Sequence, residues 1–228
     1  MRVALVVAAS ALLAGCSGDG GGSAEHTAAP ATSSSATISV PSRSATPTSA
    51  PPSLVPAAGA PIADVIAWIE AGEPADAAAF HTMTRGGETT DLGDGVAFVA
   101  AGNQANCVTN EHLDGALACL VKLSDPPPRP AGIETAWKDN WVDFPGATVD
   151  VGSPHGDPGP FVNGTGSVLP AGRTLAFGDY RCRADAAALY CVDYAHQSAV
   201  EMSTTGVQGF GCLQKVTPPA DIGIRLSC

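Results

Sequence analysis

Closely paired cysteines are the feature of this sequence that most restricts its fold. Six of the seven cysteines fall between residues 107 and 228, in three pairs. The second cysteine of each pair follows a leucine by two positions, and a turn-prone stretch separates it from the first. Residues two apart lie on the same face of a strand. The pattern predicts three antiparallel hairpins, each closed by its own disulfide: Cys107–Cys119, Cys182–Cys191 and Cys212–Cys228.

Other uses of these six cysteines fit the sequence less well. Six cysteines allow 15 pairings, but only local pairing explains the repeated spacing. A zinc site would need a Cys-x-x-Cys pair or a histidine at ligand spacing, and the sequence has neither. We therefore predict no bound metal, no cofactor and no free thiol in this part of the chain. Disulfide loops of this size stabilise a fold by about 3 kcal/mol each.

The beginning of the chain has the organisation of a lipoprotein signal. Arg2 precedes an apolar run from Val3 to Ala14, which suits a secretory signal and is too short to cross a bilayer. The run ends in Leu13-Ala14-Gly15-Cys16, which resembles the lipobox of bacterial lipoproteins. We predict a signal peptide over residues 1–15 and lipidation of Cys16. The alternative is an ordinary secreted protein with a cysteine at this position by chance.

Lipidation of Cys16 would determine where the protein is located and would make the membrane its partner. A diacylglyceryl group on Cys16 would hold the exported chain on the outer face of the cytoplasmic membrane, in the cell envelope, because two acyl chains give stable anchoring. Residues 16–61 then form a tether. Of the 45 residues from 17 to 61, 37 are Ser, Thr, Ala, Gly or Pro, a composition typical of disorder. O-glycosylation of this tether and an unmodified spacer both remain open.

Residues 62–228 are long enough for one domain and contain mostly strand-like patterns. A proline precedes and a glycine follows an amphipathic stretch over residues 61–72, which predicts a short helix with Ile62, Val65, Ile66 and Ile69 on one face. Pro74 to Phe80 could add another helical turn. Strands are predicted near residues 95–99, 147–151, 174–177 and 222–228. We expect a mainly β (α+β) fold of disulfide-stapled hairpins with one or two short N-terminal helices.

The acidic balance of the domain restricts its partners. Residues 62–228 carry 9 basic and 20 acidic side chains, a net charge of −11. Nucleic-acid phosphates and bare anionic lipid would repel such a surface. An envelope protein, a glycan or an apolar ligand remain as expected partners, and no nucleic acid is expected.

The usual signatures of catalysis and of calcium binding are missing from the sequence. No Gly-x-Ser-x-Gly motif is present, and the histidines are scattered singly. Asp91-Leu92-Gly93-Asp94-Gly95 lacks the ligand series of a calcium loop, so we interpret it as a turn into a strand. The charges of residues 179–185 are interpreted as pairing across a hairpin. We predict no catalytic residue.

The strongest candidate for a binding surface is an aromatic stretch with a neighbouring loop. Residues 137–144 hold the largest concentration of aromatic side chains, and residues 153–161 form a proline- and glycine-rich loop. Rigid scaffolds commonly carry binding residues on such loops. We predict that Trp137, Trp141, Phe144 and His155 contribute to this surface. The alternative is that these rings fill the core of a domain with few aromatic residues.

Two of the cysteine hairpins could belong to an internal repeat. Gly95-Val96-Ala97-Phe98 precedes the first hairpin, and Thr174-Leu175-Ala176-Phe177 precedes the second. Each hairpin then ends in Ala-Leu-x-Cys. A repeat and independent hairpins with similar patterning both account for this match.

The sequence as a whole resembles the LppI-type lipoproteins of mycobacteria. Besides the lipobox, the resemblance is carried by these stretches: Trp68-Ile69-Glu70-Ala71-Gly72, Thr90-Asp91-Leu92-Gly93-Asp94, Gly115-Ala116-Leu117-Ala118-Cys119-Leu120-Val121, Asp157-Pro158-Gly159-Pro160-Phe161 and Phe177-Gly178-Asp179-Tyr180-Arg181-Cys182-Arg183-Ala184-Asp185. It implies a cell-envelope lipoprotein of an actinobacterium and adds no catalytic motif. We expect a non-enzymatic lipoprotein that presents a rigid β domain to a partner or ligand. The alternative is a hydrolase acting on cell-wall polymer or lipid.

Overall fold

The computed structural model describes residues 54–228. The predicted signal peptide, Cys16 and most of the predicted tether lie outside the described residues. In the described part, no helix has the length and apolar character needed to cross a membrane.

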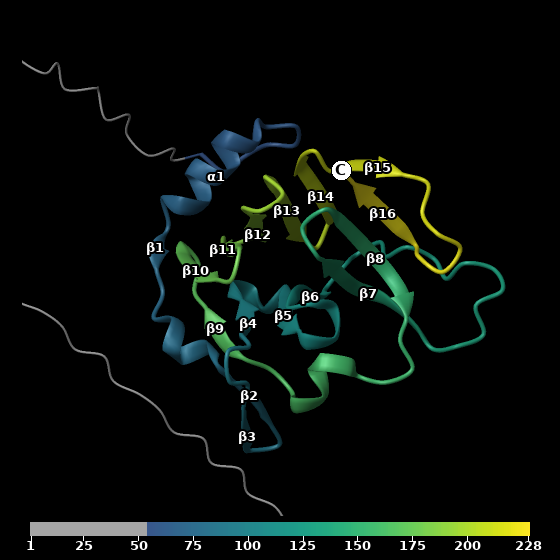
Figure 1. Ribbon diagram of the computed structural model, residues 1–228, viewed down its shortest axis with the longest axis horizontal. Coiled ribbons are helices and arrows are strands. Elements are labelled where there is room, and N and C mark those ends of the chain that lie inside the picture. Colours follow the sequence, from purple (N-terminus) through teal and green to yellow (C-terminus); the bar gives the residue numbers. More distant parts are fainter. Residues whose placement is uncertain (1–53) are drawn as a thin grey trace, which may run out of the picture. The chain divides into compact units, whose positions relative to one another are not determined.

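Two β-sheets form the body of the domain, which confirms the mainly β prediction (Figure 1). The eight-stranded sheet contains, in spatial order, β15 (Gln214–Val216), β16 (Ile224–Ser227), β8 (Thr148–Pro154), β7 (Trp137–Phe144), β6 (Ala116–Val121), β5 (Ala105–Asn110), β4 (Ala97–Ala100) and β9 (Ser167–Leu169). The six-stranded sheet contains β1 (Glu73–Pro74), β10 (Arg173–Phe177), β11 (Tyr180–Ala184), β12 (Ala188–Asp193), β13 (Ser198–Ser203) and β14 (Gly206–Gly211).

Short helices and one further hairpin complete the fold. The predicted helix forms as α1, and the predicted extra turn forms as the 3₁₀ helix η1. The strands predicted from periodicity form as β4, β8, β10 and β16, with ends that differ by at most three residues. The remaining elements are α1 (Ile62–Glu70), η1 (Ala77–Phe80), β2 (Thr82–Arg85), β3 (Glu88–Asp91), η2 (Ala101–Asn103), η3 (Glu111–Leu113) and η4 (Gly159–Asn163).

The two sheets contain the same arrangement of strands. The first meander, β4 to β8, and the second meander, β10 to β14, are each runs of five antiparallel strands in chain order. A short parallel strand lies beside the first strand of each meander: β9 pairs with β4, and β1 pairs with β10. These edge strands are exchanged between the sheets. Strand β9 precedes the second meander in the chain but pairs with the first, and β1 precedes the first meander but pairs with the second. The two sheets therefore correspond over five strands and an edge strand each, which is far more than two hairpins. This correspondence favours an internal repeat over independent hairpins with similar patterning.

The register of the two meanders shows which positions correspond. In the first, the ladder aligns Phe98 with Cys107, Cys119, Val142 and Val151 in turn. In the second, Leu175 aligns in the same way with Cys182, Cys191, Val200 and Gly209. Both rows except the glycine belong to one buried cluster between the sheets. The shared core is thus built from equivalent rows.

All three predicted disulfides are present in the structure. Cys107–Cys119 and Cys182–Cys191 join directly opposed residues of a hairpin, and all four cysteines are buried. Cys212–Cys228 differs, because its cysteines flank the β15–β16 ladder and are exposed. Two disulfides are therefore part of the core, and the third lies at the surface.

A different layer covers the outer face of each sheet. Helix α1 packs on strands β11 to β14 (Figure 1), and Trp68 contacts Tyr190 with ring centroids 4.8 Å apart. The predicted face packs on this sheet: Val65 and Ile69 are buried, and Ile62 and Ile66 are partly buried against the same cluster, to which Trp68 is added. A Cβ at Gly72 would meet Thr174 Cγ2 at 2.5 Å, so the helix approaches this sheet only because its end carries a glycine. On the eight-stranded sheet, the β2–β3 hairpin and η4 cover a smaller apolar cluster.

Candidate functional site

The predicted aromatic surface is largely interior. Trp141 is 1% exposed and Phe144 is 0% exposed, so neither side chain belongs to the surface. Phe144 lies between the sheets against Tyr180, whereas Trp141 lies on the outer face of the same strand. Trp137 and His155 are half-buried. The core alternative therefore holds for Trp141 and Phe144, because a chain with only 5% aromatic residues needs its large rings for packing.

The structure does bring two of the predicted residues together. The imidazole of His155 stacks on the indole of Trp141 with ring centroids 3.6 Å apart, and Phe161 meets the same indole edge-on at 5.0 Å. Burial lowers the pKa of His155, so its ring is neutral at physiological pH. These contacts fix the start of η4 on the sheet. The predicted residues thus support a nearby loop.

A cleft lies where η4 approaches the turns at one end of the two sheets. It consists of two adjoining hollows, which share Leu92, Gly95, Thr109 and Glu111. The smaller hollow has a volume of about 180 Å³ and the larger about 640 Å³. The larger volume falls within the range of small-ligand sites. The smaller is lined further by Val108, Asn110, His112, Gly159, Pro160, Val162 and Asn163, and the larger by Gly93, Asp94, Asp114, Gly115, Phe177, Gly178, Asp179 and Tyr180.

Local backbone geometry positions the turns around this cleft. The turn before β4 closes with a hydrogen bond from Gly95 N to Leu92 O of 2.9 Å. The connection from β5 to β6 begins where the Asn110 side chain accepts a hydrogen bond of 3.0 Å from His112 N, which caps η3. It ends at Asp114, whose φ of 51° turns the chain back towards β6. These interactions fix the shape of each of the two polar turns that line the cleft.

The rim of the cleft is acidic. Its four carboxylate side chains are exposed, and none forms an ion pair within the described chain. No lysine or arginine of residues 54–228 lines either hollow. Walls of one sign concentrate the electrostatic potential in a cleft. The acidic residues are Asp94, Glu111, Asp114 and Asp179.

Aromatic and amide groups also line the cleft. Phe177 and Tyr180 stack with centroids 5.6 Å apart, and the Tyr180 hydroxyl donates a 2.9 Å hydrogen bond to Phe144 O. Burial raises the pKa of Tyr180, so the phenol stays protonated. Asn110 is 6% exposed and lines the smaller hollow. Its Oδ1 accepts the hydrogen bond from His112 N.

One sequence feature that belongs to this cleft has the pattern of an ordinary structural turn. Asp91 to Gly95 was interpreted as a plain turn, and that turn forms one wall. Residues 179–185 were expected to pair charges across a hairpin, but Arg183 instead donates to Trp68 O and covers its ring at 3.9 Å. Asp179 remains free on the rim. Acidic, glycine-containing turns recur at three places in the chain, and the fold gathers all three.

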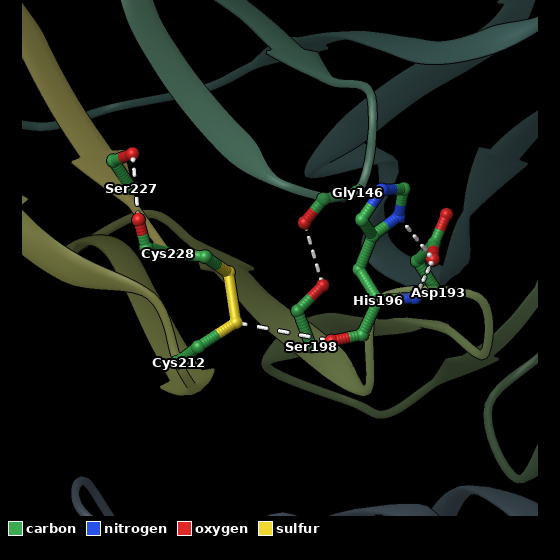
Figure 2. The surroundings of a disulfide bond; sticks show 7 residues. All are labelled: Gly146, Asp193, His196, Ser198, Cys212, Ser227 and Cys228. Atoms are coloured by element: carbon green, nitrogen blue, oxygen red, sulfur yellow. Dashed lines mark hydrogen bonds and ion pairs between the residues drawn. A yellow bond between two sulfur atoms is a disulfide. The ribbon is translucent and has the colours of Figure 1, made fainter.

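A second group of polar residues lies near the exposed disulfide (Figure 2). Asp193 is 3% exposed, and its Oδ1 is 2.9 Å from His196 Nδ1. The Ser198 hydroxyl donates to Gly146 O at 2.6 Å, so it is not directed to this imidazole. A Cβ at Gly146 would meet His196 Nδ1 at 2.4 Å, which shows how tightly the pair packs there. The pair fixes a turn, and the third member of a hydrolytic triad is engaged elsewhere.

Comparisons with known proteins leave the geometry as the main guide to function. No protein-family model, curated protein or solved structure matches the chain. Within residues 54–228, no group of three or more His, Cys, Asp or Glu side chains is arranged to hold a metal ion. The acid-rimmed cleft is therefore the candidate site that the described residues define best.

Proposed function

We propose that this protein is a cell-envelope lipoprotein whose β domain binds a partner or ligand without chemical conversion. The signal-like segment and Cys16 support anchoring at the outer face of the cytoplasmic membrane. The three disulfides support an oxidising location outside the cytoplasm.

The observation that carries this proposal is the cleft on a rigid scaffold. Buried disulfides join β5 to β6 and β11 to β12, and turns next to these hairpins form the cleft walls. A pre-organised site loses less conformational entropy on association. The position of binding turns beside crosslinked strands is therefore well suited to recognition.

Ligand capture tests the binding part of the proposal. The full chain is expressed with its own signal in a bacterial host that lipidates it, extracted in mild detergent and examined by mass spectrometry. Glu111→Trp fills the junction between the two hollows, and Glu134→Trp places the same ring on an exposed loop elsewhere. A co-purifying molecule that Glu111→Trp loses and Glu134→Trp retains is the expected result. The proposal fails if both variants retain every molecule bound to the wild type.

Fractionation tests the anchoring part separately. We expect the wild-type chain in the membrane fraction and the Cys16→Ser variant in the soluble fraction. A variant that remains on the membrane as tightly as the wild type would show that Cys16 is not the anchor.

A further inference from the structure

We infer that Cys212–Cys228 is a reversible modification site, at which a low-molecular-weight thiol exchanges with the disulfide and releases strand β15. The inference depends neither on the cleft nor on its ligand. It rests on three observations: the exposure of this disulfide, the contact of one of its sulfur atoms, and the unequal attachment of the two strands that it joins.

The three disulfides differ in how accessible they are to a thiol in solution. The cysteines of the two hairpin disulfides are at most 1% exposed, and they join directly opposed residues inside a ladder. Cys212 and Cys228 are both exposed and flank the β15–β16 ladder. Exchange requires a thiolate to reach a sulfur atom, and exposed disulfides are the labile ones. Of these three disulfides, Cys212–Cys228 alone is therefore open to exchange while the domain stays folded.

The exchange itself is a displacement at sulfur. The thiolate attacks one sulfur of the pair, a new S–S bond forms, and the Cys212–Cys228 bond breaks. The electron pair of the broken bond goes to the departing sulfur, which takes a proton from water. The products are a mixed disulfide and one free thiol, so this step involves no net oxidation. A second thiolate removes the adduct as the symmetrical disulfide of the small thiol, which is thereby oxidised while both cysteines are reduced.

The surroundings of Cys212 favour the mixed disulfide on Cys228. Cys212 Sγ lies 3.8 Å from His196 O (Figure 2), so a free thiol there has a carbonyl acceptor within reach. The turn that carries this carbonyl is fixed, because Asp193 Oδ1 accepts a 2.8 Å hydrogen bond from His196 N and lies 2.9 Å from Nδ1. The two possible mixed disulfides interconvert through attack by the free thiol, so the more stable one accumulates. We therefore expect the adduct on Cys228 and the thiol on Cys212.

The two strands of the hairpin are attached unequally, so opening of the disulfide frees one of them. Strand β16 also pairs with β8, and Arg225 donates hydrogen bonds of 2.6 and 2.5 Å to Asp150 of that strand. Strand β15 pairs with β16 alone, over three residues that are all exposed. Without the disulfide, β15 keeps only this short ladder and the buried Leu213 that precedes it. We expect residues 214–216 to open more often while β16 stays in its sheet.

Peptide mapping of the wild-type chain tests the modification site. The full chain is extracted in mild detergent, and any free thiol is blocked with iodoacetamide, which is then removed. The folded protein is incubated with N-acetylcysteine and quenched in acid, and its new thiols are trapped with N-ethylmaleimide before mass spectrometry.

We expect exchange at Cys212–Cys228 to be at least about 100-fold faster than at either buried pair, because the buried sulfurs react only after local opening. The adduct should lie mainly on Cys228. Equal rates at the three disulfides, or exchange at Cys212–Cys228 only in urea that unfolds the domain, overturn the inference. An adduct mainly on Cys212 refutes the role of His196 O.

The double variant Cys212→Ser with Cys228→Ser tests the release of β15. It lacks the exposed disulfide and keeps the two buried ones, so N-acetylcysteine should leave it unmodified under the same conditions. Modification of its buried pairs at the wild-type rate of Cys212–Cys228 would refute selection by access. In hydrogen exchange, we expect faster exchange in residues 214–216 of this variant than in the wild type, and equal exchange in β8, β11 and β12. Unchanged exchange in β15, or equal acceleration in β8, refutes the release of β15.

Discussion

The two meanders share a topology, but one of two equivalent turns borders an open cleft and the other is covered by a neighbouring segment. The β5–β6 connection of the first meander carries η3 and forms a wall of the open cleft. The corresponding β11–β12 connection, residues 185–187, is shorter. Gln104 at the end of η2 donates a 2.6 Å hydrogen bond to Ala186 O, so η2 closes against that turn. The β10–β11 turn is the counterpart of η2, because both connect the first two strands of a meander. The larger hollow lies between this turn and the β5–β6 connection.

This difference separates the parts of the chain that carry stability from those that carry the site. The equivalent core rows and their disulfides are alike in both meanders. Even a half-buried acid recurs: Asp143 follows Val142 in the first meander, and Glu201 follows Val200 in the second. Both carboxyls have a raised pKa through burial. The candidate site lies only where the repeat is broken by a longer turn.

The largest expected effect comes from removing the tryptophan that supports each outer face. Trp68→Ala and Trp141→Ala should each lower the free energy of unfolding by about 3–5 kcal/mol, because both indoles are buried. Only Trp141 holds η4 beside the cleft, through His155 and Phe161. We therefore expect Trp141→Ala alone to reduce capture of the molecule that co-purifies with the wild type. Urea unfolding and mass spectrometry of the purified variants check the two outcomes, and equal loss of the captured molecule in both variants would contradict the assignment.

The disulfides are expected to rank by burial and not by loop length. Chain entropy alone assigns about 3 kcal/mol to each and slightly more to Cys212–Cys228, which spans the longest loop, with a separation of 16 residues. Replacing the pairs by alanine also removes buried sulfur from the core for Cys107–Cys119 and Cys182–Cys191. We expect these two variants to lose similar stability, and more than the third. Denaturant unfolding measures the order, and a greater loss from the exposed pair would show that loop entropy dominates.

The two half-buried acids predict a free energy of unfolding that falls as pH rises. Burial raises the pKa of Asp143 from 3.8 to about 6, and the charge of Asp150 adds to this shift. Between about pH 4 and pH 6 the unfolded chain loses this proton while the folded chain keeps it, so the folded state loses stability. Asp143→Asn should raise the free energy of unfolding by about 2 kcal/mol at pH 7 and leave it unchanged below pH 4. Unfolding curves across this range check the expectation.

The equivalent acid in the second meander provides the matched variant. Burial raises the pKa of Glu201, and the Tyr190 hydroxyl opposes the shift. Glu201→Gln should therefore change the pH profile in the same direction and by less than Asp143→Asn. Parallel pH profiles of the wild type and both variants would show that neither carboxyl titrates abnormally.

Local features of the fold were predictable from the sequence, and distant pairings were not. The hairpins and their disulfides follow from patterns within about 20 residues of chain. The pairing of β1 with β10 was not predictable, because a two-residue strand has no periodicity and its partner lies about 100 residues away. The cleft was missed for a related reason, since each of its turns looks ordinary alone. Trp141 was found as an important residue, but one sequence could not tell that it packs inward.

The smallest expected effect tests why the second turn is closed. Gln104→Ala removes one hydrogen bond to Ala186 O and should lower the free energy of unfolding by about 1 kcal/mol. If this contact holds the turn, hydrogen exchange should accelerate at Asp185, whose amide bonds to Ala188 O, and stay unchanged in η3. If the shorter connection alone keeps the turn closed, exchange at Asp185 stays at the wild-type rate. In that case the longer β5–β6 connection around η3, and not the absence of a contact like that of Gln104, accounts for the open turn of the first meander.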